Sequence, residues 1–309
     1  MALEPEILDR PSAEGARIVA LALISEACER ARRIGDPGDA EALHDFRVSV
    51  RRLRSSLRTW RDVLGRAVRD KDLRRLRKIA RATADARDAE VLVAWIDRTA
   101  KDLPAALRPA AAWLARRHSR RTRDVELAAS GERFVAACVP LSRRLERRRK
   151  PRSREAFAAA VAARVREQAA RVASRLARVE TLVDATHAHR ARIDEKRLRY
   201  LLEPLRDVPG VGAEHAVAAL RRLQDLLGAL NDAVLALEAV GAARLEAERD
   251  TRGRRLRPGL VALEFQAASR AAAAFARVRA EVLPRRGSAL LEPALAVAET
   301  LEARAAQRP

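Results

Sequence analysis

The chain has 309 residues and a net charge of +21, because 63 Lys and Arg residues outnumber 42 Asp and Glu residues. Apolar residues make up 48% of the sequence, enough for a sizeable core in one large domain or two smaller ones. No apolar run is expected to reach the length of a membrane span, and two cysteines exclude a disulfide-rich framework.

Helix-forming residues dominate the sequence. Ala, Leu, Arg and Glu are abundant, whereas the usual signal of a strand, a run of alternating β-branched and aromatic residues, is nearly absent. The predicted fold class is therefore all-α.

The predicted elements begin with a short arm, residues 1–11, and a helix that ends near Arg33, before the Gly- and Pro-containing residues 35–38. Further helices of the first half are expected at about 40–64, 68–82, 109–129 and 132–149. Breaks are expected at the polar residues 85–89, which an apolar stretch to about Thr99 follows, and at Ser130-Gly131. In the second half, a helix is expected at about 153–183 and is followed by the helix of the second pattern, which ends at about Arg206 or earlier at Pro204. Another helix is expected at 213–249, and two more are expected on either side of residues 284–287.

Two further features bear on the cellular compartment. Cys28 and Cys138 lie far apart in the sequence, in apolar helical segments, and each is predicted to be a buried thiol. The N-terminus lacks the pattern of a signal peptide. We therefore expect a cytoplasmic protein.

A pattern headed by histidine occurs twice, from His44 and from His189. In both copies basic residues follow at +3, +7, +8 and +10, and leucine follows at +9. Weaker matches keep the same order along the rest of the chain. We therefore predict an internal duplication that forms two pseudo-symmetric antiparallel helical bundles, residues 12–150 and 151–309. The basic residues 147–152 between them are expected to be a solvated junction, with contact to a polyanion as the alternative.

On a helix, the basic residues of each pattern fall on one side. In the first copy this stripe consists of Arg47, Arg51, Arg54, Arg58 and Arg61, without an intervening acid. In the second copy it consists of Arg192, Lys196 and Arg199, and Glu203 stands where the first copy has Arg58. Apolar residues form the opposite side of each helix, as expected for a buried face.

Like charges at this spacing destabilise an isolated helix by a few tenths of a kcal/mol per pair. Either acids from neighbouring helices or a multivalent anion must compensate them, and the repetition of the stripe in a strongly basic chain favours the anion. The histidines at the head of each stripe are suited to hydrogen-bond a phosphate. Metal ligation is disfavoured, because each half supplies one of these histidines without a nearby Cys or acidic ligand set.

The sequence resembles the CHAD family, the conserved histidine α-helical domain, over about residues 12–280. Both histidine patterns carry the resemblance, together with Ala86-Arg87-Asp88 and the segment from Leu223 to Asp232. The resemblance implies a helical domain with a basic groove or pore between two bundles. It also implies binding of inorganic polyphosphate and, in some members, attachment to polyphosphate granules. The triphosphate-processing barrel of other members is not expected, because only a short arm precedes the first helix.

The resemblance also implies which residues line the groove. The candidates are the basic and histidine residues of the two patterns and five further cations, four of which match each other in pairs between the halves. They are His44, Arg47, Arg51, Arg54, His189, Arg192, Lys196 and Arg199, followed by Lys78, Arg87, Arg121, Arg222 and Arg270.

Three functions compete at this stage. The first is binding of polyphosphate through arginine forks and released counterions, with granule-associated proteins as further partners. The second is binding of nucleic acid, which is disfavoured because aromatic platforms and known duplex-reading motifs are missing from the sequence. The third is phosphate chemistry at a histidine, for which neither a nucleophile with its base nor a metal site is recognisable. We expect a binding protein without enzymatic activity, metal or cofactor.

Overall fold

A computed structural model describes residues 3–34, 39, 41–119, 127–147, 154–249, 253–285 and 287–307. For residues 83–88 and 127–129 it describes only the backbone. The described residues form helices and contain no strand; an isolated bridge joins Pro11 and Ala156. The α-helices are α1 Ser12–Arg33, α2 Ala42–Thr59, α3 Arg61–Leu64, α4 Asp70–Asp102, α5 Arg108–Ser119, α6 Leu127–Glu146, α7 Phe157–Leu176, α8 Ala185–Leu202, α9 Ala213–Ala247, α10 Arg257–Glu281 and α11 Ser288–Ala306.

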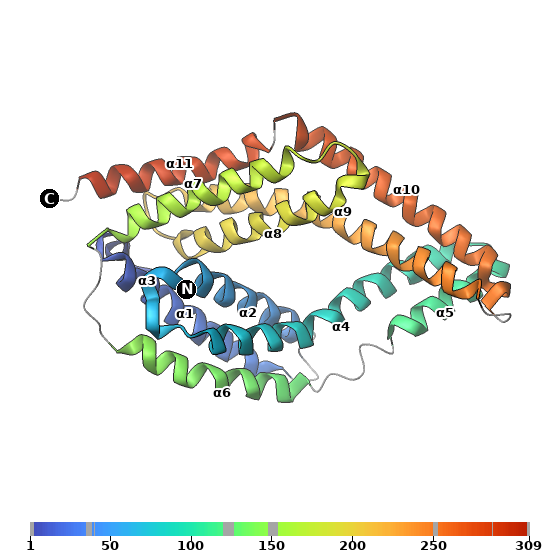
Figure 1. Cartoon of the computed structure of the whole chain (residues 1–309), viewed down its shortest axis with the longest axis horizontal. Coiled ribbons are helices and arrows are strands. Elements are labelled where there is room, and N and C mark those ends of the chain that lie inside the picture. Colours follow the sequence, from blue (N-terminus) through green and yellow to red (C-terminus); the bar gives the residue numbers. More distant parts are fainter. Residues whose placement is uncertain are drawn as a thin grey trace.

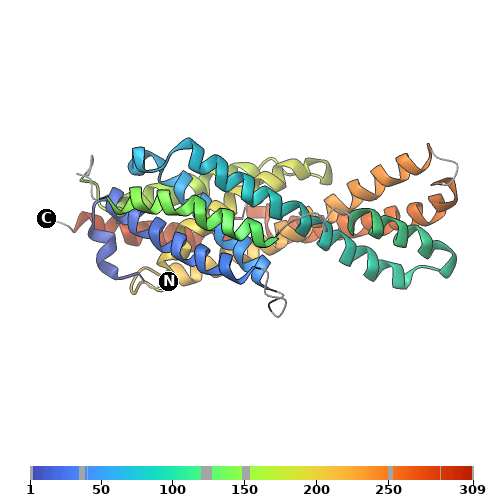
Figure 2. The same cartoon turned by 90° about the horizontal axis from the view of Figure 1, so that it is seen from below.

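The helices pack into two bundles that lie side by side and a third that extends from one end (Figures 1 and 2). The first bundle contains α1, α2, α6 and the first half of α4, and the second contains α7, α8, α11 and the first half of α9. The second halves of α4 and α9 pack with α5 and α10 into the distal bundle, which Figure 2 shows as a separate lobe. The two halves of the chain thus order their helices alike, while the duplication itself and the boundary at residues 150–151 stay predictions.

Two apolar clusters hold this arrangement together. One cluster runs without interruption through the first and second bundles, from Phe46 and Leu53 on α2 to Leu198 and Leu202 on α8. The other fills the distal bundle, where Trp95 and Ile96 of α4 pack with residues of α5, α9 and α10. The buried side of α2 predicted from the sequence is confirmed, because Phe46, Leu53 and the other apolar residues of that side are at most 2% exposed.

The long helix α9 belongs to both clusters. Among the described helices it is the one that is long and apolar enough to cross a membrane by length and composition, so the expectation that no apolar run reaches that length was wrong. Its leucines from Leu220 to Leu230 lie in the core of the second bundle, and Ala236, Val240 and Ala243 lie in the distal core. Packing in two bundles therefore accounts for its apolar composition.

Several predicted helix boundaries were wrong. The expected break at residues 85–89 lies inside α4. The segment contains two aspartates, which are poor helix formers, but its other residues are Ala and Arg and it has no Gly or Pro. Ser130-Gly131 lies inside α6, where a Cβ on Gly131 would come within 2.6 Å of the Ala31 carbonyl oxygen. Glycine here permits the close approach of α6 to α1 rather than a break. The helix expected over 40–64 is divided at Trp60 into α2 and α3.

The N-terminal arm is packed against the bundles. It forms a 3₁₀ helix, Pro5–Asp9, whose Ile7 and Leu8 side chains are buried in the shared core. Asp9 accepts hydrogen bonds from Arg304 on α11, and the Phe157 N–H donates to the Arg10 carbonyl. The arm therefore ties the start of the chain to the second bundle.

Candidate functional site

The two histidine patterns lie on α2 and α8, which contact each other where the first and second bundles meet. Glu203, just after α8, pairs with Arg52 of α2 through Oε2 and Nε, 2.8 Å apart, and with Arg199 of α8. Arg52 also donates to Glu26 of α1 at 2.8 Å. The residue that breaks the basic stripe in the second copy thus forms an ion pair that joins the two helices.

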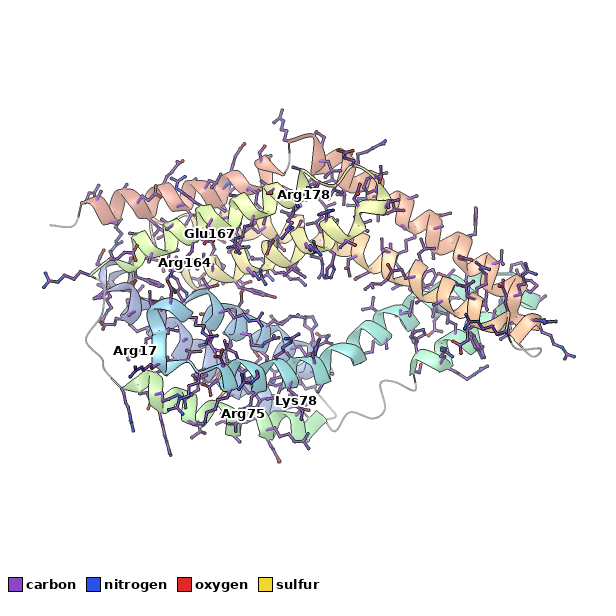
Figure 3. All side chains as sticks on the ribbon, in the orientation of Figure 1. Arg17, Arg75, Lys78, Arg164, Glu167 and Arg178 are labelled. Carbon is purple, nitrogen blue, oxygen red and sulfur yellow. The ribbon has the colours of Figure 1, made fainter. Side chains whose placement is uncertain are left out.

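A cavity of about 1050 Å³ opens beside this junction, between α2, α3, α7 and α8. Ten charged residues line it: Arg51, Arg54, Arg58, Arg61, Asp62, Arg164, Glu167, Arg171, Lys196 and Arg197. Eight of them are cations and two are acids, so the cavity is strongly basic. Figure 3 shows Arg164 and Glu167 on α7, the helix that closes one side.

Half of the lining cations already have acidic partners. Arg164 pairs with Asp62 at 2.6 Å, and its guanidinium lies 4.3 Å from the centre of the Trp60 ring. Three others pair likewise: Arg61 with Asp70 and Arg171 with Glu167, both at 2.6 Å, and Arg197 with Asp194 at 2.8 Å. Three of these pairs neutralise the wall formed by α3 and α7, and the pair of Arg197 with Asp194 lies on α8.

The other four lining cations, Arg51, Arg54, Arg58 and Lys196, form no ion pair with any described residue. Three belong to the first pattern's stripe and one to the second. The Nε atom of Arg51 is buried and has no hydrogen-bond partner among the described residues. Because an unsatisfied buried donor costs about 1–3 kcal/mol, this side chain is suited to receive an acceptor from a ligand.

The electrostatics of Lys196 show that the two stripes adjoin. Burial, followed by the positive charges of Arg192 and Arg51, lowers the pKa of Lys196 to about 7. Arg51 belongs to α2, so a cation of the first pattern acts directly on a cation of the second. Behind Lys196, burial raises the pKa of Glu195 to about 8, against the opposing effect of Arg199 and Lys196. A carboxyl group held largely neutral does little to compensate the local positive charge.

Arg54 extends the basic surface toward α4. Burial, followed by the charges of Arg58, Arg77 and Arg81, lowers the pKa of Arg54 to about 10, which still leaves it charged at neutral pH. Arg77 and Arg81 are exposed and come one turn apart on α4. Cations of α2, α4 and α8 therefore gather in one region.

Three predicted site residues, Arg51, Arg54 and Lys196, line this cavity together. Arg192 is half-buried next to Lys196 and passes over Gly228 of α9, where a Cβ would lie 3.5 Å from its Nε. His44 and His189 are both exposed and are not among the lining residues. The Nδ1 atom of His189 lies 2.5 Å from Oδ1 of Asn231, so α9 orients this ring.

Two residues of the predicted stripes are buried away from the cavity. Arg47 is 7% exposed and interacts with other residues of the chain. Arg199 is also 7% exposed, donates to Glu203 and Gln224, and stacks on Tyr200 with its guanidinium 4.6 Å from the ring centre. Arg199 thus serves the ion pair between the bundles instead of facing the cavity.

Three of the five second-rank candidates can be placed in the structure, and they lie apart from one another. Lys78 borders a separate cavity of about 430 Å³ between α4 and α6, beside Arg75 (Figure 3). Arg222 pairs with Glu281 at 2.9 Å, and Arg270 lies in the distal bundle, 5.9 Å from the Trp95 ring centre. The Arg87 side chain and the whole of Arg121 lie outside the described residues.

Sequence reasoning missed the contribution of α7. Arg164 and Arg171 are seven residues apart and share one helix face, a signal that was present in the sequence but not tied to the histidine patterns. It also did not select Arg77, the neighbour of Lys78, whose charge acts on Arg54. The described residues contain no group of three or more His, Cys, Asp or Glu side chains that could hold a metal ion.

Comparisons with known proteins agree with this fold. The family model described as the CHAD domain matches residues 19–241. The crystal structure of the CHAD domain from the plant Ricinus communis matches with a TM-score of 0.63 at 20% identity, covering 94% of this chain and 94% of that chain. PptA from Streptomyces chartreusis matches with a TM-score of 0.59 at 18% identity, covering 91% of this chain and 99% of that chain. No curated protein matches.

These matches confirm two predictions, the all-α fold and the resemblance to the CHAD family. At identities of 20% and below, the two solved structures establish the fold alone. The residues that would bind a ligand in this chain have to be argued from its own geometry.

The buried position of Arg199 leads to a prediction about stability. Replacing Arg199 with Ala leaves the Glu195 and Glu203 carboxyl groups buried with one partner fewer. We expect the free energy of unfolding, measured by urea titration, to fall by about 3 kcal/mol. The control Arg206→Ala removes an exposed pair with Asp207 and should leave the free energy of unfolding nearly unchanged. Equal effects of the two variants would contradict the structural role of Arg199.

Proposed function

This chain belongs to the CHAD family, and we propose that it binds inorganic polyphosphate in the basic cavity between α2, α3, α7 and α8. One observation carries the proposal: Arg51, Arg54, Arg58 and Lys196, from the basic stripes of both patterns, meet at one cavity and form no ion pair with any residue that the structure describes. Positive charges that are held together without nearby acids attract a multivalent anion and make its binding more favourable.

The chemistry of the lining residues suits a chain of phosphates. Each guanidinium offers a planar fork of N–H donors that matches phosphate oxygens, and the Lys196 ammonium adds a point charge. The cavity volume of about 1050 Å³ lies just above the usual range for ligand pockets, ~300–1000 Å³, so the cavity has room for several phosphate groups. Arg77 and Arg81 on α4 provide a basic path for the part of a long chain that extends beyond it.

The same lining disfavours nucleic acid. Single strands are bound by stacking their bases on exposed aromatic rings. Tyr200 is the aromatic residue among those that line the cavity; it is 6% exposed and covered by Arg199. A polyanion without bases fits this surface better than one with bases.

We further propose that the protein binds polyphosphate without converting it, and that it acts in the cytoplasm at polyphosphate granules and beside their associated proteins. The support is the family membership together with the four unpaired cations, which suit charge-based retention. A fluorescent fusion should gather on the granules of polyphosphate-accumulating cells, and an evenly spread signal would contradict this assignment.

Charge removal tests the proposed site. In the double variant Arg54→Ala, Arg58→Ala, we expect the affinity for long-chain polyphosphate, measured by titration calorimetry at near-physiological salt, to fall at least about tenfold. The slope of log affinity against log salt concentration should become shallower by roughly 1.4 to 1.8, because two charges are removed. Relief of repulsion between like charges should leave the fold intact.

A matched control removes the same charge elsewhere. Arg254 and Arg255 are exposed beside the distal bundle, and their double replacement with Ala should leave polyphosphate affinity nearly unchanged. Duplex DNA added as a competitor should displace polyphosphate poorly. Equal losses in both double variants, or a preference for DNA, would overturn the proposed function.

The titration of Lys196 predicts a pH dependence of binding. Bound phosphate favours the ammonium form and so raises the pKa of Lys196 above its value of about 7 in the free protein. The contribution of Lys196 to affinity is therefore complete below pH 7 and is lost as pH rises through the pKa of the complex.

Calorimetry in two buffers of different ionisation enthalpy measures this effect. At pH 8 the wild-type protein should take up close to one proton when polyphosphate binds, while Lys196→Met should take up markedly less. Because the end groups of polyphosphate titrate equally in both experiments, the difference in proton uptake between the two proteins measures the protonation of Lys196. The same proton uptake in both proteins would contradict the placement of Lys196 in the site.

A further inference from the structure

Cys28 on α1 and Cys138 on α6 meet in the first bundle, although α2 to α5 separate them in the sequence. Their side chains are hydrogen-bonded to each other, and both thiols are free. The close approach of α6 to α1 at Gly131 brings the two helices together. The prediction that each cysteine is a buried thiol was therefore correct for Cys138 and wrong for Cys28, which is half-buried.

The two thiols differ in accessibility and acidity. Cys138 is 1% exposed and belongs to the shared core, whereas Cys28 lies at its edge. The hydrogen bond from Cys138, and then the charge of Arg32, lower the pKa of the Cys28 thiol. The same hydrogen bond and burial raise the pKa of Cys138. A reachable, more acidic thiol backed by a shielded one is the arrangement of an attacking and a resolving cysteine.

We propose that Cys28 and Cys138 form a disulfide in response to oxidation and thereby tie α6 to α1. The oxidant is a small disulfide such as oxidised glutathione. The Cys28 thiolate attacks one of its sulfurs, the sulfur–sulfur bond breaks, and one glutathione thiolate leaves. Cys138 then loses its proton and attacks the Cys28 sulfur of the mixed disulfide, releasing the second glutathione. Two protein thiols are oxidised, and one glutathione disulfide is reduced to two thiols.

The bond closes a loop that contains α2, the helix that supplies Arg51, Arg54 and Arg58. A link between distant residues restricts the unfolded chain and so stabilises the folded state. The first bundle is expected to unfold at a higher temperature under oxidising than under reducing conditions. This inference does not depend on which ligand the cavity binds.

The test uses the full chain incubated with oxidised glutathione and then analysed by mass spectrometry and thermal unfolding. We expect a monomer that has lost the mass of two hydrogen atoms, a linked pair of peptides containing Cys28 and Cys138, and a raised Tm. The variant Cys138→Ser should stop at a glutathione adduct on Cys28. The variant Cys28→Ser should remain unmodified, because Cys138 is shielded.

The wild-type protein alone can overturn the proposal, whether or not the variants fold. Two free thiols after prolonged oxidation, a stable glutathione adduct, or a disulfide-linked dimer would each show that the two cysteines do not form the bond. A disulfide that leaves Tm unchanged would overturn the stabilisation of the first bundle.

Discussion

An ion network at the junction of α2 and α8 holds together two helices whose basic stripes repel each other. Glu203 pairs with Arg52 from one helix and Arg199 from the other, and all three side chains are mostly shielded from water. Attraction between charges strengthens in such an environment, but removal of a single partner leaves a costly unpaired charge. The network therefore fixes where the two stripes meet, and the position of the cavity follows from it.

The apolar core provides the stability that this accumulation of charge requires. A single cluster runs through both bundles, and the packed N-terminal arm adds Ile7 and Leu8 to it. Because the core is continuous, α2 and α8 cannot separate to relieve the repulsion between Arg51 and Lys196. Burial, followed by the charges of Arg192 and Arg51, lowers the pKa of Lys196, so repulsion from Arg51 is one part of this shift. A bound polyanion would supply the missing negative charge. The repulsion between cations in the free protein would then be relieved on binding, which increases the affinity for the ligand.

The sequence allowed much of the fold and part of the site to be predicted. Helix propensity and apolar spacing are local properties, which is why the all-α class and the buried side of α2 could be read directly. Burial of a particular arginine depends on neighbours that are distant in sequence. Arg47 and Arg51 share a stripe, yet the first is buried and the second lines the cavity. Likewise, only the packing of α7 on α8 shows that Arg164 belongs to the site.

The central claim is that both histidine patterns contribute to one site for polyphosphate. The most direct measurement is a crystal structure of the protein with a short linear polyphosphate. We predict phosphate density in the cavity beside the α2–α8 junction, in contact with Arg54 or Arg58 from the first pattern and with Lys196 from the second. Density confined to another surface, such as the smaller cavity at Lys78, or contacts from one pattern alone would contradict the account.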